Sequence, residues 1–109
     1  MTLTQSNLIY CTRENQINRL IKEQKFSKKK SYFLFVSLWD DVCSSLLKEL
    51  ENNPPPFPVN IVNSFDTPHS FVIWSVEKTP TLVMLDGGGR KVSTTGHVTD
   101  IYKRLKLEK

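Results

Sequence analysis

The chain has 109 residues, and at roughly 100 to 200 residues per domain this length fits one domain spanning residues 1–109. Hydrophobic residues make up 39% and charged residues 24% of the sequence, a composition that excludes an intrinsically disordered chain. No apolar run reaches the roughly 18 residues of a membrane span, and the first residues lack the apolar centre of a signal peptide. We therefore expect a cytoplasmic protein with no membrane contact, whose two cysteines are reduced.

The net charge of +4 is concentrated in two basic runs. Segment 19–30 holds six cations against Glu23, and segment 103–109 holds four cations against Glu108. Each run falls where a helix ends or a loop begins, and cations suit the C-terminal end of a helix dipole. Neither run is interleaved with several aromatic residues, so we do not expect nucleic-acid binding.

The first third of the chain alternates strand and helix patterns. Leu8–Cys11 predicts a short strand, and Thr12 offers an N-cap oxygen to a helix that runs to about Lys25. A near-continuous apolar run, Tyr32–Leu38, is typical of a central strand that is buried on both faces.

The middle of the chain repeats this alternation. Leucines at helical spacing predict a helix from Val42, which ends at the prolines of segment 54–56. Val59–Val62 predicts a third strand, and Asp66–Pro68 predicts the start of a third helix, which should end before Pro80. Three apolar residues of that helix are interpreted as core residues: Phe71, Ile73 and Trp74.

The last third predicts a β-hairpin and a helix. Thr81–Leu85 and Lys91–Thr95 are strand patterns separated by the glycine-rich turn 86–90, Gly96 ends the second strand, and Thr99 can cap a last helix. Strands separated by helices should pair in parallel through right-handed crossovers, whereas the hairpin makes the last two strands antiparallel. The sequence therefore predicts an α/β fold of order βαβαβαββα, with a mixed sheet and helices on both faces.

Two motifs resemble the thioredoxin-like superfamily, in a resemblance that extends from Leu8 to Leu107. Phe33–Cys43 (FLFVSLWDDVC) resembles an apolar strand with the family's usual Asp-Phe-Trp-Ala-x-Trp-Cys-Gly-Pro-Cys. Segment 76–89 (VEKTPTLVMLDGGG) resembles Val-x-x-x-Pro-Thr, an apolar strand and a glycine hairpin. The resemblance implies a thioredoxin-like fold with strand order 1-3-2-4-5, four flanking helices, and a cis peptide bond before Pro80 that faces the active cysteine.

The redox chemistry of that family needs an attacking thiolate and a second cysteine three residues later, on the first turn of the helix. One register keeps the spacing from Trp39 and makes Cys43 the attacking thiol. The resolving position is then Leu46, and Ser37 replaces the family's buried aspartate. A second register places Cys43 at the resolving position and Asp40 at the attacking position. It breaks the spacing from Trp39 and leaves no attacking thiol.

Neither cysteine has a partner that the sequence identifies. Cys43 follows a predicted helix N-terminus, which favours a thiolate, but the carboxylates of Asp40 and Asp41 oppose ionisation, so we expect a thiol of ordinary acidity. Cys11 ends a strand two places away in the implied sheet order, roughly 10 Å or more from Cys43 and too far for a disulfide. The two histidines have no clustered ligands, and we expect no metal and no cofactor.

The leading hypothesis is a divergent thioredoxin-like domain that binds a partner protein or an extended peptide. The residues assigned to this surface are Trp39, Asp40, Asp41, Val42, Thr79, Pro80, Thr81 and Gly96. The alternative hypothesis is a monothiol oxidoreductase, in which Cys43 forms mixed disulfides with glutathione or a protein and an outside thiol resolves them. A basic module that binds nucleic acid is the third reading.

Overall fold

The computed structural model of the chain describes residues 7–28, 30–37, 39–87 and 90–105. Within these residues the elements follow the predicted order βαβαβαββα. They are β1 Leu8–Cys11, α1 Glu14–Ser27, β2 Ser31–Val36, α2 Asp41–Asn52, β3 Val59–Asn63, α3 Pro68–Ile73, β4 Thr81–Leu85, β5 Lys91–Thr95 and α4 Val98–Arg104. Three residues named in the sequence analysis lie outside the described residues, namely Leu38, Leu107 and Glu108, as do Gly88 and Gly89 of the glycine-rich turn.

The strands form one mixed sheet in the order β1-β3-β2-β4-β5. β1 and β2 pair in parallel with β3, and β4 pairs antiparallel with both β2 and β5. The predicted fold class and strand order are therefore confirmed. The central position of β2 explains its apolar sequence, because every residue from Phe33 to Val36 is fully buried.

The direction of β4 differs from the expectation that helix-separated strands run parallel. A parallel crossover must carry the chain back to the far end of the sheet, as α1 and α2 do. The intervening α3 has only six residues, about 9 Å of helix. The chain therefore enters β4 near the end at which β3 stopped, and β4 runs antiparallel to β2.

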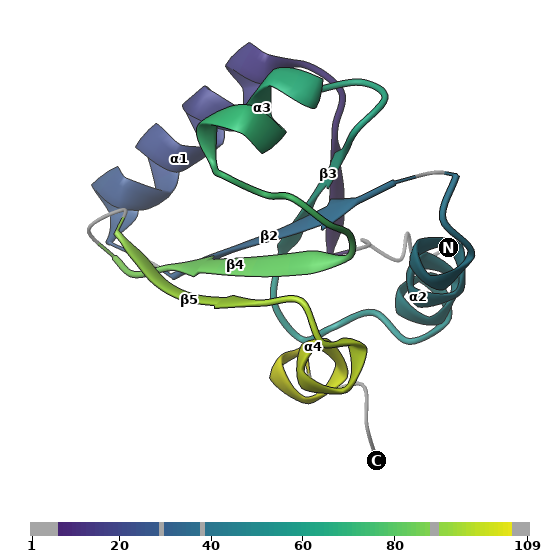
Figure 1. Ribbon diagram of the computed structural model, residues 1–109. Coiled ribbons are helices and arrows are strands. Elements are labelled where there is room, and N and C mark those ends of the chain that lie inside the picture. Colours follow the sequence, from purple (N-terminus) through teal and green to yellow (C-terminus); the bar gives the residue numbers. More distant parts are fainter. Residues whose placement is uncertain (1–6, 29, 38, 88–89, 106–109) are drawn as a thin grey trace, which may run out of the picture.

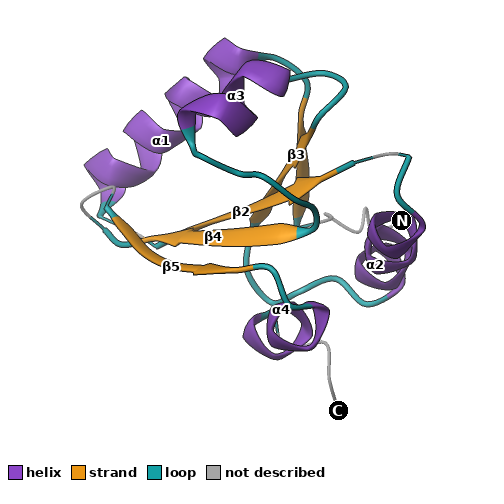
Figure 2. Cartoon of the chain, viewed as in Figure 1, coloured by secondary structure: helices purple, strands orange, loops and turns teal. Residues whose placement is uncertain are grey.

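Helices cover both faces of the sheet, with α1 and α3 on one face and α2 and α4 on the other (Figures 1 and 2). Alternate residues of β2 supply the two cores: Leu34 and Val36 pack toward α2 and α4, and Phe33 and Phe35 pack toward α1 and α3. The cysteines are divided in the same way. Cys43 belongs to the first core and Cys11 to the second, so the sheet separates their sulfur atoms.

Two predicted helix starts are wrong. Helix α1 begins at Glu14 rather than directly after Thr12, whose N–H donates to Gln16 Oε1 at 3.1 Å. In α4 the N-cap is His97, and Thr99 lies inside the helix. In both cases a hydroxyl residue near the start was taken for the cap, but the helix phase is fixed by the buried apolar residues that follow.

A carboxylate from α1 holds the start of α3. Glu14 accepts hydrogen bonds from the His69 N–H at 3.0 Å and from the Ser70 hydroxyl. Thr67, the N-cap residue, makes no side-chain cap bond, so Glu14 satisfies a backbone donor that would otherwise have no helical partner. None of the helices in the described part of the chain is long and apolar enough to cross a membrane.

Candidate functional site

The turn before α2 is organised by Asp40. Asp40 is the N-cap of α2, with an extended backbone (φ −99°, ψ 122°), and its Oδ1 accepts a hydrogen bond from the Val42 N–H at 2.9 Å. This capping bond explains why the helix begins at Asp41. The second carboxylate oxygen, Oδ2, accepts a hydrogen bond of 3.4 Å from the hydroxyl of Thr79. One side chain thus joins two segments that lie 39 residues apart in the sequence.

Thr79 belongs to the loop between α3 and β4. The Thr79–Pro80 peptide bond is cis, the isomer that the resemblance implies. The Thr81 hydroxyl donates to the Lys78 carbonyl at 2.7 Å. The loop touches the end of β5, because a Cβ atom added to Gly96 would lie 3.7 Å from both the Pro80 carbonyl oxygen and the Thr81 hydroxyl.

Five of the residues assigned to the binding surface are therefore brought together: Asp40, Thr79, Pro80, Thr81 and Gly96. The main-chain N–H and C=O of Thr79 make no hydrogen bond within the described residues. An unpaired main-chain donor and acceptor at a partly exposed residue can pair with another chain.

Apolar side chains extend this surface at the start of α2. Trp39 is 82% exposed and Val42 is 48% exposed, although burying a tryptophan side chain in a protein contact is strongly favourable. Asp41 is also exposed. The sequence analysis missed Lys78, whose Cε would lie 3.3 Å from a Cβ on Gly96. The signal was available, because Lys78 lies inside the Val-x-x-x-Pro-Thr motif.

The structure places Cys43 where it cannot act as the attacking thiol. Cys43 is the third residue of α2 and has no exposed surface. Its Sγ accepts a 3.4 Å hydrogen bond from the Ser37 N–H. The side chain packs in the same core as Leu34 and Leu46. A disulfide cannot reach this sulfur unless the start of α2 moves, so the burial of Cys43 opposes its role as the candidate attacking thiol.

This geometry agrees with the second register. Cys43 lies on the first turn of the helix, which is where the resemblance puts the resolving cysteine. Asp40 precedes the helix and contacts the residue before Pro80, which is where the resemblance puts the attacking cysteine. In this register the family's buried aspartate, six residues before the attacking cysteine, corresponds to Leu34. Leu34 is fully buried in the same core as Cys43. Trp39 then occupies the place of the pattern's second tryptophan.

The other candidate groups lie away from this surface. Cys11 is fully buried in the other core, and burial raises the pKa of its thiol to about 11. The side chains of His69 and His97 are exposed. Among the described residues, no three His, Cys, Asp or Glu side chains are grouped so that they could hold a metal ion.

Comparison of the sequence with protein-family models and with curated proteins gives no match. Solved structures do match. A poplar thioredoxin h aligns over 93% of this chain and 95% of its own, with 18% identity and a TM-score of 0.76. A thioredoxin from Nicotiana alata aligns over 100% and 99%, with 15% identity and a TM-score of 0.75. Fasciola hepatica thioredoxin aligns over 93% and 99%, with 18% identity and a TM-score of 0.74. The sheet order, the helix layers and these matches agree, and the chain has the thioredoxin fold.

Proposed function

We propose that this domain binds an extended segment of a partner protein, at the surface formed by the Trp39–Cys43 turn, the loop Thr79–Thr81 and Gly96. The observation that carries the proposal is the contact between Asp40 and Thr79. A carboxylate, which can accept hydrogen bonds but cannot form a disulfide, occupies the attacking position of the turn, and the cysteine of the turn is buried. Binding needs no thiol, whereas dithiol exchange needs two.

The surface offers two kinds of interaction to an extended chain. The free main-chain groups of Thr79 can pair with it as with an added strand. The exposed side chains of Trp39 and Val42 supply apolar area next to the turn, and exposed tryptophans are frequent hot spots of protein interfaces.

The alternative is monothiol exchange between Cys43 and glutathione or a protein disulfide. It requires the Cys43 sulfur to meet the incoming disulfide in line, and the complete burial of the residue opposes that approach. Redox activity of the domain is therefore weak at most. We place the function in the cytoplasm, which is supported by two free cysteines in a chain of this size.

Selection of peptides tests the proposal. A random dodecapeptide library displayed on phage is panned against the immobilised full chain, and the affinities of selected peptides are measured in solution. We expect Trp39→Ala to weaken binding by about thirtyfold or more, since truncating a hot-spot tryptophan costs at least about 2 kcal/mol. The matched control is Phe26→Ala, which removes an equally exposed aromatic ring at the end of α1. Failure to select any peptide, or selection of peptides indifferent to Trp39→Ala, contradicts the proposal.

A further inference from the structure

The helices α1 and α3 leave one edge of their sheet face uncovered. They lie over the other strands, while the same face of the edge strand β5 has no helix above it (Figure 1). Two adjoining cavities of about 230 and 360 Å³ occupy this region and share Trp74 and Lys91 among their lining residues. We call these two cavities together the β5 groove.

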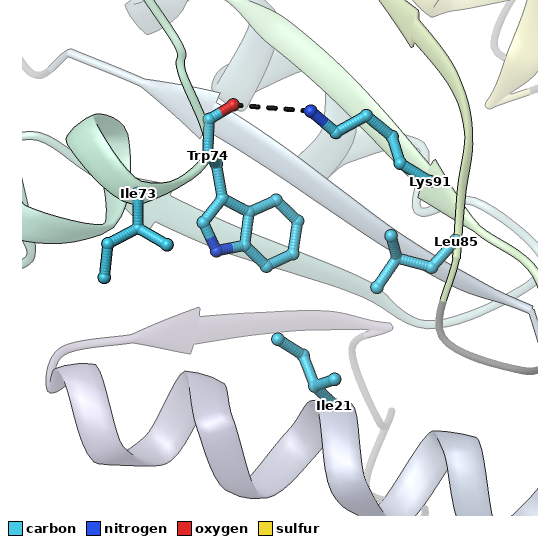
Figure 3. A pocket seen from close by; sticks show the side chains of 5 residues that line it. All are labelled: Ile21, Ile73, Trp74, Leu85 and Lys91. Atoms are coloured by element: carbon cyan, nitrogen blue, oxygen red, sulfur yellow. Dashed lines mark hydrogen bonds between the residues drawn. The ribbon is translucent and has the colours of Figure 1, made fainter.

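The smaller cavity is apolar and has a fixed floor. It is lined by Ile21 of α1, Ile73 at the end of α3, Trp74 directly after α3, and Leu85 of β4. The indole ring lies between Ile73 and Leu85 (Figure 3). The Trp74 ring packs against Phe33 and Phe35, with centroid distances of 5.0 and 5.3 Å, which fixes its position. Ile73, by contrast, is 63% exposed, so its assignment to the core is wrong. The cavity can bury a large apolar side chain together with this exposed isoleucine.

Charged side chains line part of the larger cavity. Lys78 and Lys91 supply two positive charges and Glu77 one negative charge, and Thr94 lies with them in the lining. Lys91 Nζ reaches only the Trp74 carbonyl oxygen, at 3.5 Å (Figure 3). No carboxylate pairs with either lysine within the described residues. Two ammonium groups without a carboxylate partner favour a ligand that carries negative charge.

The larger cavity is also continuous with the proposed binding surface, because Thr81 and Gly96 line it. From Thr81 to Leu85, β4 advances four residues, which is about 13 Å at ~3.3 Å per residue. An extended chain that passes Thr81 therefore reaches the apolar cavity about four residues later.

We infer that the β5 groove binds the continuation of the partner segment, with an acidic side chain at Lys78 and Lys91 and a large apolar side chain beside Trp74. This inference rests on the proposed function, because it takes the occupant to be the same segment. The ligand class is thus an acidic extended peptide with an apolar residue about four positions from the residue at Thr81.

Nuclear magnetic resonance with the selected dodecapeptides tests the inference. The chain contains two tryptophans, so a ¹⁵N-labelled sample gives two indole N–H signals, which Trp39→Phe assigns. We expect the peptides to be enriched in Asp or Glu and to shift both signals. We also expect Lys91→Glu to weaken binding by about tenfold, because it sets like charges against each other. The matched control, Lys103→Glu, makes the same charge change on α4, across the sheet, and should change affinity by less than about twofold.

The outcomes separate the inference from the proposed function. A shift of the Trp39 signal alone, or a peptide affinity that Lys91→Glu does not change, contradicts peptide binding in the β5 groove. Neither result contradicts the proposed binding surface. A shift of the Trp74 signal alone contradicts the proposed surface, and with it the inference that the groove holds the continuation of the same segment. A Trp74 signal that moves with protein concentration in the absence of peptide assigns the groove to a second copy of the chain and overturns the inference. Selection of no peptide overturns both.

Discussion

The Thr79 hydroxyl donates a 3.4 Å hydrogen bond to the Asp40 carboxylate, and this contact joins the start of α2 to the loop before β4. The resemblance places a reactive sulfur at this point. In the second register the Asp40 carboxylate stands where the resemblance implies a nucleophile, and its other oxygen caps the helix. The arrangement predicts which single substitution restores the missing chemistry.

Asp40→Cys should create a working dithiol with Cys43. Residues three apart at a helix start have Cα atoms about 5 Å apart, within the range that a disulfide spans. We expect the variant to form this disulfide and to accelerate insulin reduction by dithiothreitol. The unmutated chain should not exceed the rate of its own Cys43→Ala variant, because it has no second thiol at the turn.

The matched control for this prediction is Leu46→Cys, which completes the pair in the other register. Leu46 is 1% exposed and points into the core, so we expect no insulin reduction from this variant. Activity in Leu46→Cys and none in Asp40→Cys would show that the turn follows the first register.

Access, rather than charge, should control the reactivity of both cysteines. Cys11 and Cys43 have no exposed surface, so alkylation by iodoacetamide must wait for an opening of the structure. We expect native protein to react far more slowly than protein in urea, as followed by mass spectrometry. Asp40→Asn with Asp41→Asn should change the Cys43 rate only as much as it changes stability. If the double variant reacted several-fold faster at Cys43 without loss of stability, the charge of the two carboxylates, and not burial, would limit the alkylation rate.

The thiol of Cys11 should make stability fall in alkaline solution. Burial raises the pKa of Cys11 from 9.0 to about 11, so between these values the unfolded chain loses a proton that the folded chain retains. The contribution is fully present below pH 9 and is lost as the pH rises toward 11. Urea unfolding at pH 8.5 and pH 10 should show the decrease. Tyr10, whose pKa is raised from 10.0 to about 12, begins to add to it near pH 10, so the share of the thiol is the part that a Cys11 variant removes.

Cys11→Ala should flatten this pH dependence while lowering stability at every pH. Val62→Ala is the matched control, since Val62 pairs with Cys11 in the sheet and is equally buried, but has no titrating group. Val62→Ala should lower the free energy of unfolding at every pH but leave its decrease with pH unchanged. If the free energy of unfolding fell equally steeply with pH in the unmutated chain and in Cys11→Ala, the Cys11 thiol would be excluded as the source of the pH dependence.

The sequence predicted the elements better than the positions of individual side chains. The apolar run of β2 and the alternation of helices and strands follow from local patterns, and the sheet order followed from the resemblance. Cys43 lies three residues before Leu46 and seven before Leu50, so helical spacing places it on their buried face. The Ser37 N–H that donates to its sulfur did not follow, because that contact comes from the segment before the helix.

The β5 groove was beyond sequence reasoning for a different reason. Its residues come from α1, α3, β4 and β5, and no local pattern relates them. The sequence suggested that Ile73 packs in the core. Helix α3 is too short to bury its whole apolar surface, and Ile73 falls on the open side.

Gly87→Ala should destabilise the fold because the turn after β4 lies directly against the end of α1. A Cβ atom on Gly87 would lie 2.6 Å from the carbonyl oxygen of Lys28 and 2.9 Å from its carbonyl carbon. These are backbone atoms, and Lys28 is held in a left-handed conformation (φ 60°) at the end of α1, so the contact cannot be relieved by a rotamer change. We expect a loss of about 1 to 3 kcal/mol in the free energy of unfolding, measured in urea.

Gly96→Ala is the matched control, since the nearest neighbour of an added Cβ is the flexible Lys78 side chain at 3.3 Å. Its free energy of unfolding should stay within about 0.5 kcal/mol of that of the unmutated chain. Equal stability of the two variants would mean that the turn and the end of α1 are not packed together as described.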